Sequence, residues 1–242
     1  MRYGIFSDVH SNLEALGAVI KAYEPESIDK YLCIGDSVGY AANPNECIAK
    51  IRALETISVA GNHDWASINL FSLDNLNQLA RQAILWTKNC LNLESMALLE
   101  GFNLVYKDEY LTLVHGSLDR PQEFQYTYNS EDAWATFNIL ETKLCFIGHS
   151  HIPGIFIRDI TDNIRYLEEP SIEIKEYNNY IINVGSVGQP RDGNPKAAFC
   201  IYDTDTGVIE IKRVAYNVEE TRNKIINAGL PRRLGDRLLI GE

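Results

Sequence analysis

The 242-residue sequence predicts an α/β fold, and three observations support this prediction. Five short apolar runs contain β-branched and aromatic residues, as strands buried on both faces do. Helical patterns follow two of the early runs within a few residues, as βαβ units require. After residue 151 the apolar residues recur with a period of two, which is typical of antiparallel strands. We therefore expect βα units in one sheet and a second, antiparallel sheet packed on it.

The five apolar runs all end in polar tips. The runs are residues 3–6, 31–34, 57–60, 111–114 and 144–147. The tips are Asp8-Val9-His10, Gly35-Asp36, Gly61-Asn62-His63-Asp64, His115-Gly116 and Gly148-His149-Ser150-His151, and they contain every histidine of the chain. Open α/β sheets bind ligands beyond the carboxyl ends of their strands. We therefore expect these side chains to meet at one edge of the fold.

Helix signals lie between and after the runs. Ser11 starts a segment with capping-box spacing, and Pro44 occupies the first position of the next predicted helix. Residues 65–100 are predicted to be largely helical, packed outside the sheet or forming a partial lid over the site. Residues 118–130 are predicted to form a loop near the His115 tip.

The second half contains turn and cap signals as well. Ser130 is predicted to cap a short helix, and a last helix is predicted from Asn217 to Gly229. Residues 162–163 and 206–207 are predicted hairpin turns. Since the chain shows neither an internal repeat nor a linker, we expect a single domain over residues 1–242.

Composition excludes several functional classes. Lys plus Arg number 22 and Asp plus Glu 33, so the net charge of -11 argues against a protein that coats nucleic acid. The five cysteines are odd in number and lack C-x-x-C spacing, which predicts reduced thiols and a cytoplasmic location. No apolar stretch approaches 18 residues and no signal peptide is recognisable, so we expect no membrane span.

The polar tips have two interpretations. A lone histidine at a strand end is usually a hydrogen-bonded residue, and a lone aspartate before a helix is usually a cap. That explanation would have to hold at five places, whereas a two-metal hydrolytic site explains all of them. Asp8 and His10 are two residues apart, as are His149 and His151, so extended backbone would point each pair to one side. Asp36 has two oxygens and could bridge two cations.

As a set, the tips resemble the motifs of the calcineurin-like metallophosphoesterase superfamily over nearly the whole chain. Residues 35–40 and 183–192 resemble its small bacterial and archaeal phosphodiesterase branch. The resemblance implies a four-layer sandwich of two mixed β-sheets flanked by α-helices. It also implies two divalent transition-metal ions, with Mn²⁺ as the first choice and Fe, Zn or Ni as alternatives.

The resemblance assigns a role to each tip residue. Asp8, His10, Asp36 and His151 would bind the first ion, and Asp36, Asn62, His115 and His149 would bind the second. His63 would be the general acid for the leaving alkoxide. The implied reaction is in-line attack of a metal-bridging hydroxide on the phosphorus of a small phosphorylated substrate.

One departure from the superfamily bears on the substrate. In its phosphoprotein phosphatase branch the Gly-Asp motif continues to an Asp and an Arg, and this chain has Gly39 and Tyr40 there. The difference favours phosphodiesters over phosphoproteins. Arg191 is predicted either to contact phosphate or to form a surface salt bridge. Asp64 is predicted to be structural, as a cap of the following helix.

Three alternatives remain open from the sequence. The chain could be a dinucleoside polyphosphate hydrolase, a nucleotide or phosphoprotein phosphatase, or a non-catalytic scaffold with the same fold. A scaffold can dispense with the catalytic histidine, and here His63 and all seven predicted ligands are present. Substrate identity depends on loops that the sequence does not place.

Overall fold

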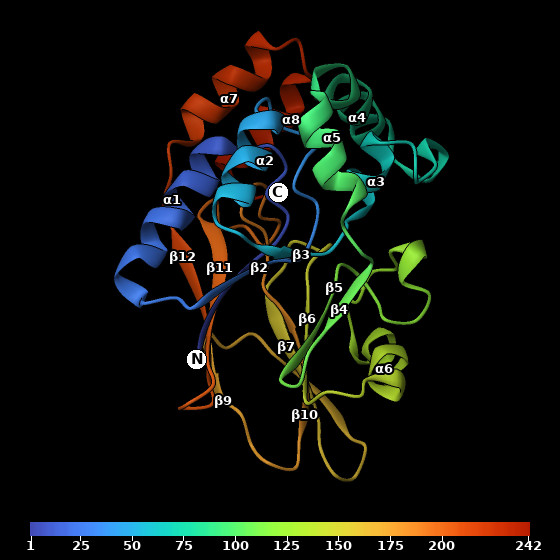
Figure 1. Ribbon diagram of the computed structural model, residues 1–242, viewed down its shortest axis with the longest axis vertical. Helices are drawn as coiled ribbons and strands as arrows, with labels where there is room; N and C mark the ends of the chain where they lie inside the picture. Colours follow the sequence, from blue (N-terminus) through green and yellow to red (C-terminus); the bar gives the residue numbers. More distant parts are fainter.

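The computed structural model describes residues 1–242, except for the side chain of Asn75. Two six-stranded mixed sheets face each other, with helices on their outer faces (Figure 1). The first sheet contains β1 (Arg2–Phe6), β2 (Lys30–Cys33), β3 (Ile57–Ser58), β9 (Ser171–Glu173), β11 (Ala197–Asp203) and β12 (Val208–Val214). The second contains β4 (Val105–Lys107), β5 (Leu111–Val114), β6 (Leu144–Ile147), β7 (Gly154–Arg158), β8 (Ile164–Leu167) and β10 (Asn179–Asn183). This confirms the four-layer sandwich.

Each sheet combines parallel and antiparallel pairs. The strand orders are β3-β2-β1-β11-β12-β9 and β4-β5-β6-β10-β7-β8. β1, β2 and β3 pair in parallel, as do β5, β6 and β10, while β11 and β7 join these groups antiparallel. The parallel group lies at one edge of the first sheet and inside the second, and the turns after β1 and β6 meet where the His149 amide donates to Asp8.

The largest core lies between the sheets. Along β1, Tyr3 and Ile5 point into it, and along β10 Tyr180 and Ile182 do the same. Phe6 points to the opposite face, against the helices. This alternation follows from the two-residue period of a strand and gives each sheet two buried faces.

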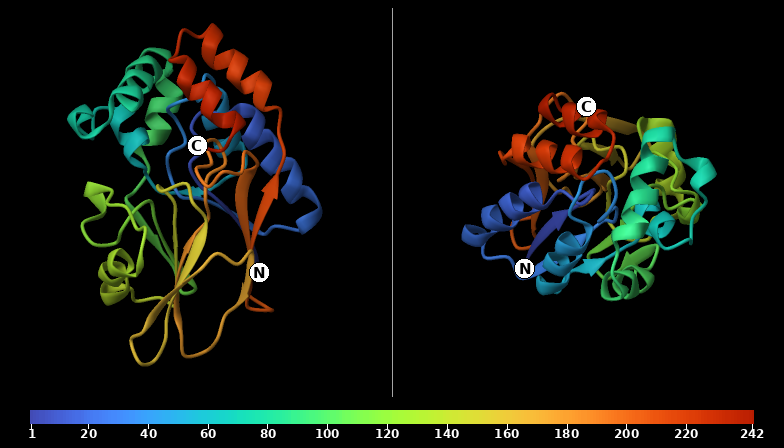
Figure 2. Two further views of the ribbon diagram at one scale, coloured as in Figure 1. Left: turned by 180° about the vertical axis from the view of Figure 1, so that it is seen from behind. Right: turned by 90° about the horizontal axis from the view of Figure 1, so that it is seen from above.

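The helices complete the outer layers. α1 (Leu13–Tyr23), α2 (Pro44–Ala53) and α7 (Val218–Asn227) lie beside the first sheet, and α6 (Ser130–Ile139) packs on the second (Figures 1 and 2). α3 (Asn62–Ser67), α4 (Gln78–Cys90), α5 (Leu93–Glu100) and α8 (Arg232–Asp236) gather at the end where the parallel strands stop. Short 3-10 turns occur at Glu24–Glu26, Leu73–Asn75, Pro121–Glu123 and Arg237–Leu239. Residues 65–100 are thus largely helical, as predicted.

Several sequence predictions need correction. The five apolar runs do not share one sheet, because β5 and β6 pair with β10 in the second sheet. The third run forms only a two-residue strand, and Val59 beyond it makes an isolated bridge to Asn103. A short α8 and a 3-10 turn follow the helix that was predicted to be the last. Both predicted hairpin turns are correct, since they join β7 to β8 and β11 to β12.

Two predicted caps lie one residue away from the observed ones. Asn12, not Ser11, accepts a hydrogen bond from the Ala15 amide and caps α1. Asn129, not Ser130, accepts from the first amides of α6. Asn12 follows Ser11 and Asn129 precedes Ser130. In both places the asparagine side chain reaches the free amides of the first helical turn.

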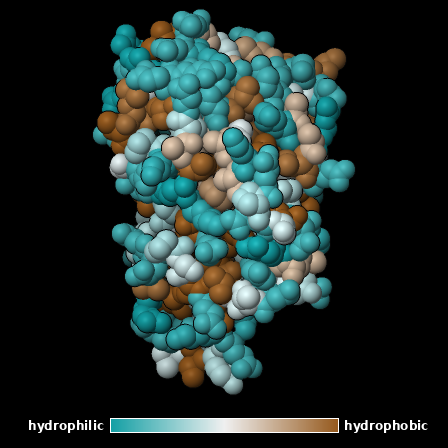
Figure 3. Space-filling view, turned by 90° about the vertical axis from the view of Figure 1, so that its left-hand side faces the viewer, coloured by the Kyte–Doolittle hydropathy of each residue, from teal (hydrophilic) through white to brown (hydrophobic). Residues whose placement is uncertain are grey.

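The surface and the thiols fit the composition. The face shown in Figure 3 is mainly hydrophilic, with hydrophobic residues in small groups. Among the described residues, no helix combines the length and the apolar character needed to cross a bilayer. All five cysteines are free, and only Cys90 is partly exposed.

Candidate metal centre

The polar tips from both sheets meet at one place, at the ends of the parallel strands. We call this group of eight residues the strand-end cluster: Asp8, His10, Asp36, Asn62, His63, His115, His149 and His151. Every member is buried. Asp8, His10 and His151 form one set of ligand atoms within 4.8 Å of one another, and Asp36, His115 and His149 form another.

The two sets meet at Asp36. Its Oδ2 lies 3.6 Å from His10 Nε2 and 3.3 Å from His115 Nε2. The structure thus places this carboxylate between the two sets, where the resemblance requires a bridging ligand. His10, Asp36 and His63 form a third set within the same range, so His63 lies close enough to compete as a ligand.

Each aspartate has one oxygen engaged by backbone and one facing the histidines. Asp8 Oδ2 accepts from the His149 amide at 3.0 Å, and Asp36 Oδ1 accepts from the His63 amide at 2.8 Å. Asp8 Oδ1 is buried without a hydrogen-bond partner among the described residues, and it lies 3.2 Å from His151 Nε2. The amides therefore orient both carboxylates and leave one oxygen of each directed into the cluster.

Three histidines are oriented in the same way. The Nδ1 atoms of His10, His115 and His151 lie 3.1, 2.6 and 2.6 Å from the carbonyl oxygens of Val38, Ile34 and Gln189. A carbonyl only accepts, so Nδ1 of each ring carries a proton and Nε2 is the nitrogen that faces the cluster. A hydrogen bond of this kind on the far nitrogen is the usual support of a metal-binding histidine.

The cluster depends on strained backbone rather than on strand alternation. Asp8, His10, Asp36, His149 and His151 all have positive φ, between 49° and 67°. The expectation that extended backbone would align each pair is therefore wrong. Backbone bonds fix these turns instead: the Asp8 and His10 amides donate to the carbonyls of Gly35 and Asp36 at 3.0 and 2.9 Å. Such strain persists where the surroundings determine the conformation, and it is common at functional sites.

Two glycines permit the close approach. A Cβ on Gly61 would lie 2.1 Å from Asp36 Oδ1, and one on Gly148 would lie 2.5 Å from Asp8 Oδ2. Both distances are far shorter than a van der Waals contact, so any side chain would displace a carboxylate. The glycines that precede Asn62 and His149 thus have the role that their positions suggested.

His63 differs from the other histidines. Its Nδ1 is buried without a partner among the described residues and faces Gly39, where a Cβ would lie 2.3 Å away. Burial lowers the pKa of His63 to about 3 and that of His151 to about 4, although Asp36 and Asp8 oppose these shifts. Burial also lowers the pKa of His115, but Asp36 and Asp8 outweigh it and raise the value to about 9. The absence of an Asp at position 39 leaves the His63 ring oriented by packing alone.

Arg191 and Tyr40 border the cavity above the cluster. The cavity is lined by Asp36, Asn62, His63, His149 and His151 as well. Arg191 Nη2 donates to Gln189 Oε1 at 3.0 Å, and its guanidinium carbon lies 5.8 Å from the centre of the Tyr40 ring. No carboxylate lies within 4 Å of Arg191 among the described side chains, so the salt-bridge alternative is wrong. The cation lines the same cavity as the Asp36 carboxylate but forms no salt bridge with it.

Asp64 connects two of the ligand-bearing loops. Its carboxylate accepts from the Gly61 amide at 3.1 Å, completing the predicted cap of α3, and from the amides of Ser37 and Val38 at 2.8 and 3.2 Å. The same carboxylate therefore caps α3 and connects it to the loop after Asp36. Its capping role was predicted from the sequence, and its bonds to the loop after Asp36 were not.

The sequence did not indicate two further neighbours. The Tyr126 ring stacks on His149, with centroids 3.8 Å apart and an angle of 15°. Asn183 donates to the Gly148 carbonyl at 2.7 Å and supports the turn before His149. Both residues lie in segments that the sequence marked as distinctive, but no local pattern predicts these contacts.

Comparison with known proteins gives a consistent result. The model of the calcineurin-like phosphoesterase superfamily domain matches residues 1–207. The chain belongs to this superfamily. A protein of Methanocaldococcus jannaschii described as uncharacterized is 41% identical over 241 residues, covering 98% of this chain and 97% of the relative.

Two crystal structures extend this comparison. A metallophosphoesterase from Sphaerobacter thermophilus has a TM-score of 0.89 and 39% identity, covering 100% of this chain and 99% of its own. A hypothetical protein from Pyrococcus horikoshii has a TM-score of 0.80 over 100% and 98% of the two chains. At 18% identity the second likeness shows the fold alone. Membership of the superfamily makes this chain a metal-dependent phosphoric ester hydrolase in class.

The strand-end cluster fits the metal ions that the superfamily implies. Asp8 Oδ1, Asn62 Oδ1 and His115 Nε2 are all buried without a hydrogen-bond partner among the described residues. Buried polar atoms are rarely left unpaired, so three together indicate groups that bind a ligand. Oxygen and imidazole donors without thiolate suit Mn²⁺, Fe²⁺, Zn²⁺ or Ni²⁺.

Proposed function

We propose that this protein is a binuclear-metal phosphodiesterase that hydrolyses a small phosphorylated substrate. The observation that carries the proposal is the pair of Asp/His sets that meet at Asp36 Oδ2. One shared carboxylate between two sets is the arrangement expected of a two-metal site. Mn²⁺ is the ion we expect from the superfamily resemblance, and the oxygen and imidazole donors suit Fe, Zn or Ni as well.

The residues divide between the two ions as the superfamily motifs imply. Asp8, His10, Asp36 and His151 would hold one ion, and Asp36, Asn62, His115 and His149 would hold the other. Two bound cations supply an activated water and positive charge for the phosphoryl oxygens. The protein contributes the fixed positions of its ligands, since the turns that carry them are cross-linked by backbone hydrogen bonds.

His63 is the residue that we expect to transfer a proton to the leaving oxygen. It follows Asn62 directly and lines the cavity above Asp36. Burial keeps its ring neutral, and a bound phosphate anion would offset this by favouring the charged imidazolium. A neighbouring phosphate anion thus acts in the direction that a general acid requires.

Arg191 and Tyr40 favour a diester. Arg191 offers the cavity a single unpaired guanidinium, and Tyr40 stands where a second arginine would serve a phosphomonoester. A monoester brings about one more negative charge at neutral pH than a diester does. With one cationic side chain at the cavity, the diester is the better match.

Metal analysis and a substrate panel test this proposal together. Protein purified without chelators should contain close to two equivalents of transition metal. With added Mn²⁺ it should hydrolyse bis(p-nitrophenyl) phosphate at least as efficiently as p-nitrophenyl phosphate. A strong preference for the monoester would favour a phosphatase. A preference for dinucleoside polyphosphates would favour a dinucleoside polyphosphate hydrolase. Absence of turnover with both metals bound would favour the scaffold.

A further inference from the structure

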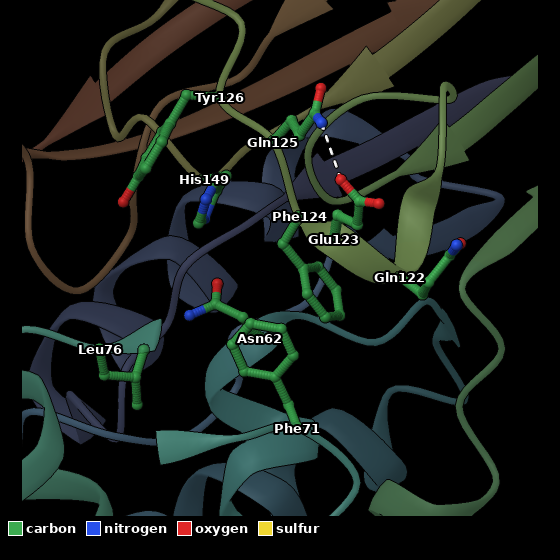
Figure 4. Close-up of a pocket in the computed structure, with 9 residues that line it drawn as sticks. All are labelled: Asn62, Phe71, Leu76, Gln122, Glu123, Phe124, Gln125, Tyr126 and His149. Atoms are coloured by element: carbon green, nitrogen blue, oxygen red, sulfur yellow. Dashed lines mark hydrogen bonds between the residues drawn. The ribbon is translucent and has the colours of Figure 1, made fainter. Parts of the chain in front are cut away.

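A second cavity opens directly beside the strand-end cluster. It has a volume of about 670 Å³. Asn62 and His149 form its inner side, and Phe71, Leu76, Phe124 and Tyr126 form its walls, so we call it the aromatic pocket (Figure 4). Its size lies within the range of small-molecule sites. Because two predicted metal ligands line it, a group bound there would lie next to the proposed metal centre.

The walls of the aromatic pocket are held in place by ring packing. Phe124 is buried and meets Phe71 edge to face with centroids 5.2 Å apart, and it meets Trp65 in the same way at 5.7 Å. Phe124 also has a φ of 51°, which a bulky residue adopts only where its surroundings require it. The pocket is therefore a built feature of the fold.

The loop that carries these rings is anchored at the cluster. A Cβ on Gly116 would lie 2.5 Å from the Gln125 carbonyl oxygen, so the loop packs closely on the turn after His115. The Tyr126 ring stacks on His149, with centroids 3.8 Å apart, and on Tyr128, with centroids 5.0 Å apart. Tyr126 is 43% exposed, so it can offer contact surface to a bound group. A planar group bound here would lie against the same rings that adjoin the metal centre.

The charges of the pocket are unlike those of the cavity that Arg191 lines. Apart from Asn62 and His149 on its inner side, it is lined by the polar side chains of Gln122, Glu123 and Gln125, and Gln125 Nε2 donates to Glu123 Oε2 at 2.9 Å. No lysine or arginine lines it among the described side chains. A second phosphate would meet a carboxylate and no cation there. An uncharged group would meet flat apolar faces and amides that can pair with its polar edge.

We propose that the aromatic pocket binds an uncharged, planar aromatic group that esterifies one oxygen of the phosphodiester. The assignment rests on the proposed function for its link to catalysis, but binding itself does not require turnover. Stacking on aromatic side chains tolerates any planar base and contributes about 10- to 100-fold in affinity per ring. A nucleoside and a simple aryl group share this chemistry.

Calorimetric titration of the manganese-loaded protein tests the assignment. The probes are adenosine, thymidine and phenol, with ribose as the non-aromatic control. We expect the aromatic probes to bind and ribose not to bind. Tighter binding of the nucleosides than of phenol would identify a nucleobase as the occupant, and the reverse order would identify a simple aryl group. Equal binding of ribose and the aromatic probes would overturn the proposal.

Variants locate the binding. Phe71→Ala should weaken the aromatic probes about 10-fold or more, and Phe71→Leu, which keeps apolar volume but removes the flat face, should weaken them less. Tyr177→Ala is the matched control, since Tyr177 is exposed and lies in the turn before β10. Unchanged affinity in both Phe71 variants would overturn the proposal.

Turnover of wild-type protein separates this proposal from the function on which it rests. Binding of aromatic probes without hydrolysis of any phosphodiester would contradict the phosphodiesterase and support the pocket. Hydrolysis of phosphodiesters without binding of any aromatic probe would support the phosphodiesterase and contradict the pocket.

Discussion

The strand-end cluster and the aromatic pocket adjoin each other but are constructed differently. The cluster takes its residues from turns after five strand segments in two sheets, and backbone hydrogen bonds fix its turns. The pocket takes its aromatic walls from two segments, around residues 71–76 and 124–126, and ring packing fixes them. The first region is suited to invariant chemistry, and the second to the choice of substrate. Substitutions in the cluster should therefore lower metal content or turnover, whereas substitutions in the pocket should lower the affinity for the bound aromatic group.

The largest effect should come from Asp36, because both sets of ligand atoms depend on it. Asp36→Asn keeps the size of the side chain and removes its negative charge, so both sites should lose metal and turnover should fall to background. Metal content and turnover with added Mn²⁺ are the measurements. Asp162→Asn is the control, since Asp162 is exposed and also has a positive φ. Two equivalents of metal in Asp36→Asn would contradict a bridging role.

His63 should matter for chemistry and not for metal binding. His63→Ala should keep both metals and lose about 10²–10⁴-fold in kcat. The loss should be smaller for a substrate whose leaving group is p-nitrophenolate, which needs no proton, than for a substrate whose leaving group is an alkoxide. His10→Ala is the informative comparison, because added metal should partly rescue it. Loss of a metal in His63→Ala would show that the third set, with His10 and Asp36, binds an ion.

Asp64 should affect how well the cluster is formed. Asp64→Asn cannot accept all three amide hydrogen bonds, so a buried amide of Gly61, Ser37 or Val38 loses its partner. We expect the free energy of unfolding to fall by about 1–3 kcal/mol and metal affinity to fall about 10- to 100-fold. Urea denaturation and metal titration measure the two effects. Lower stability with unchanged metal affinity would show that Asp64 stabilises the fold as a helix cap and does not position the metal ligands.

The sequence predicted which polar residues follow the strands, but it did not predict which strands pair with each other. Apolar runs predict where a strand lies, and the polar residues after each run identified the cluster. The partner of a strand is a different matter: β1 pairs with β11, almost 200 residues away, and nothing local to either segment specifies this. For the same reason the division of the five runs between two sheets was not predicted; the likeness to a known fold implied two mixed sheets but did not assign the runs to them.

Conformations that break local rules were also beyond prediction. Five cluster residues have positive φ, which their side chains disfavour by themselves. Only the completed hydrogen-bond network makes these turns stable, so sequence spacing suggested extended backbone instead. The Tyr126–His149 stack is a contact of the same kind, because it depends on where one loop settles on another strand end.

Arg191 lies at the cavity between the two regions and should give the smallest effect. Its guanidinium is held beside Tyr40 and Gln189, and no carboxylate is within 4 Å among the described side chains. If it contacts a phosphate oxygen, Arg191→Gln should lower kcat/KM about 10-fold or more, since one charge-assisted hydrogen bond is lost. The loss should be larger for p-nitrophenyl phosphate than for bis(p-nitrophenyl) phosphate, because the monoester has the greater charge. Metal content should stay at two equivalents. Arg52→Gln is the control, since Arg52 is an exposed partner of Glu94. Equal kcat/KM in the two variants would show that Arg191 orders Tyr40 and does not contact the substrate.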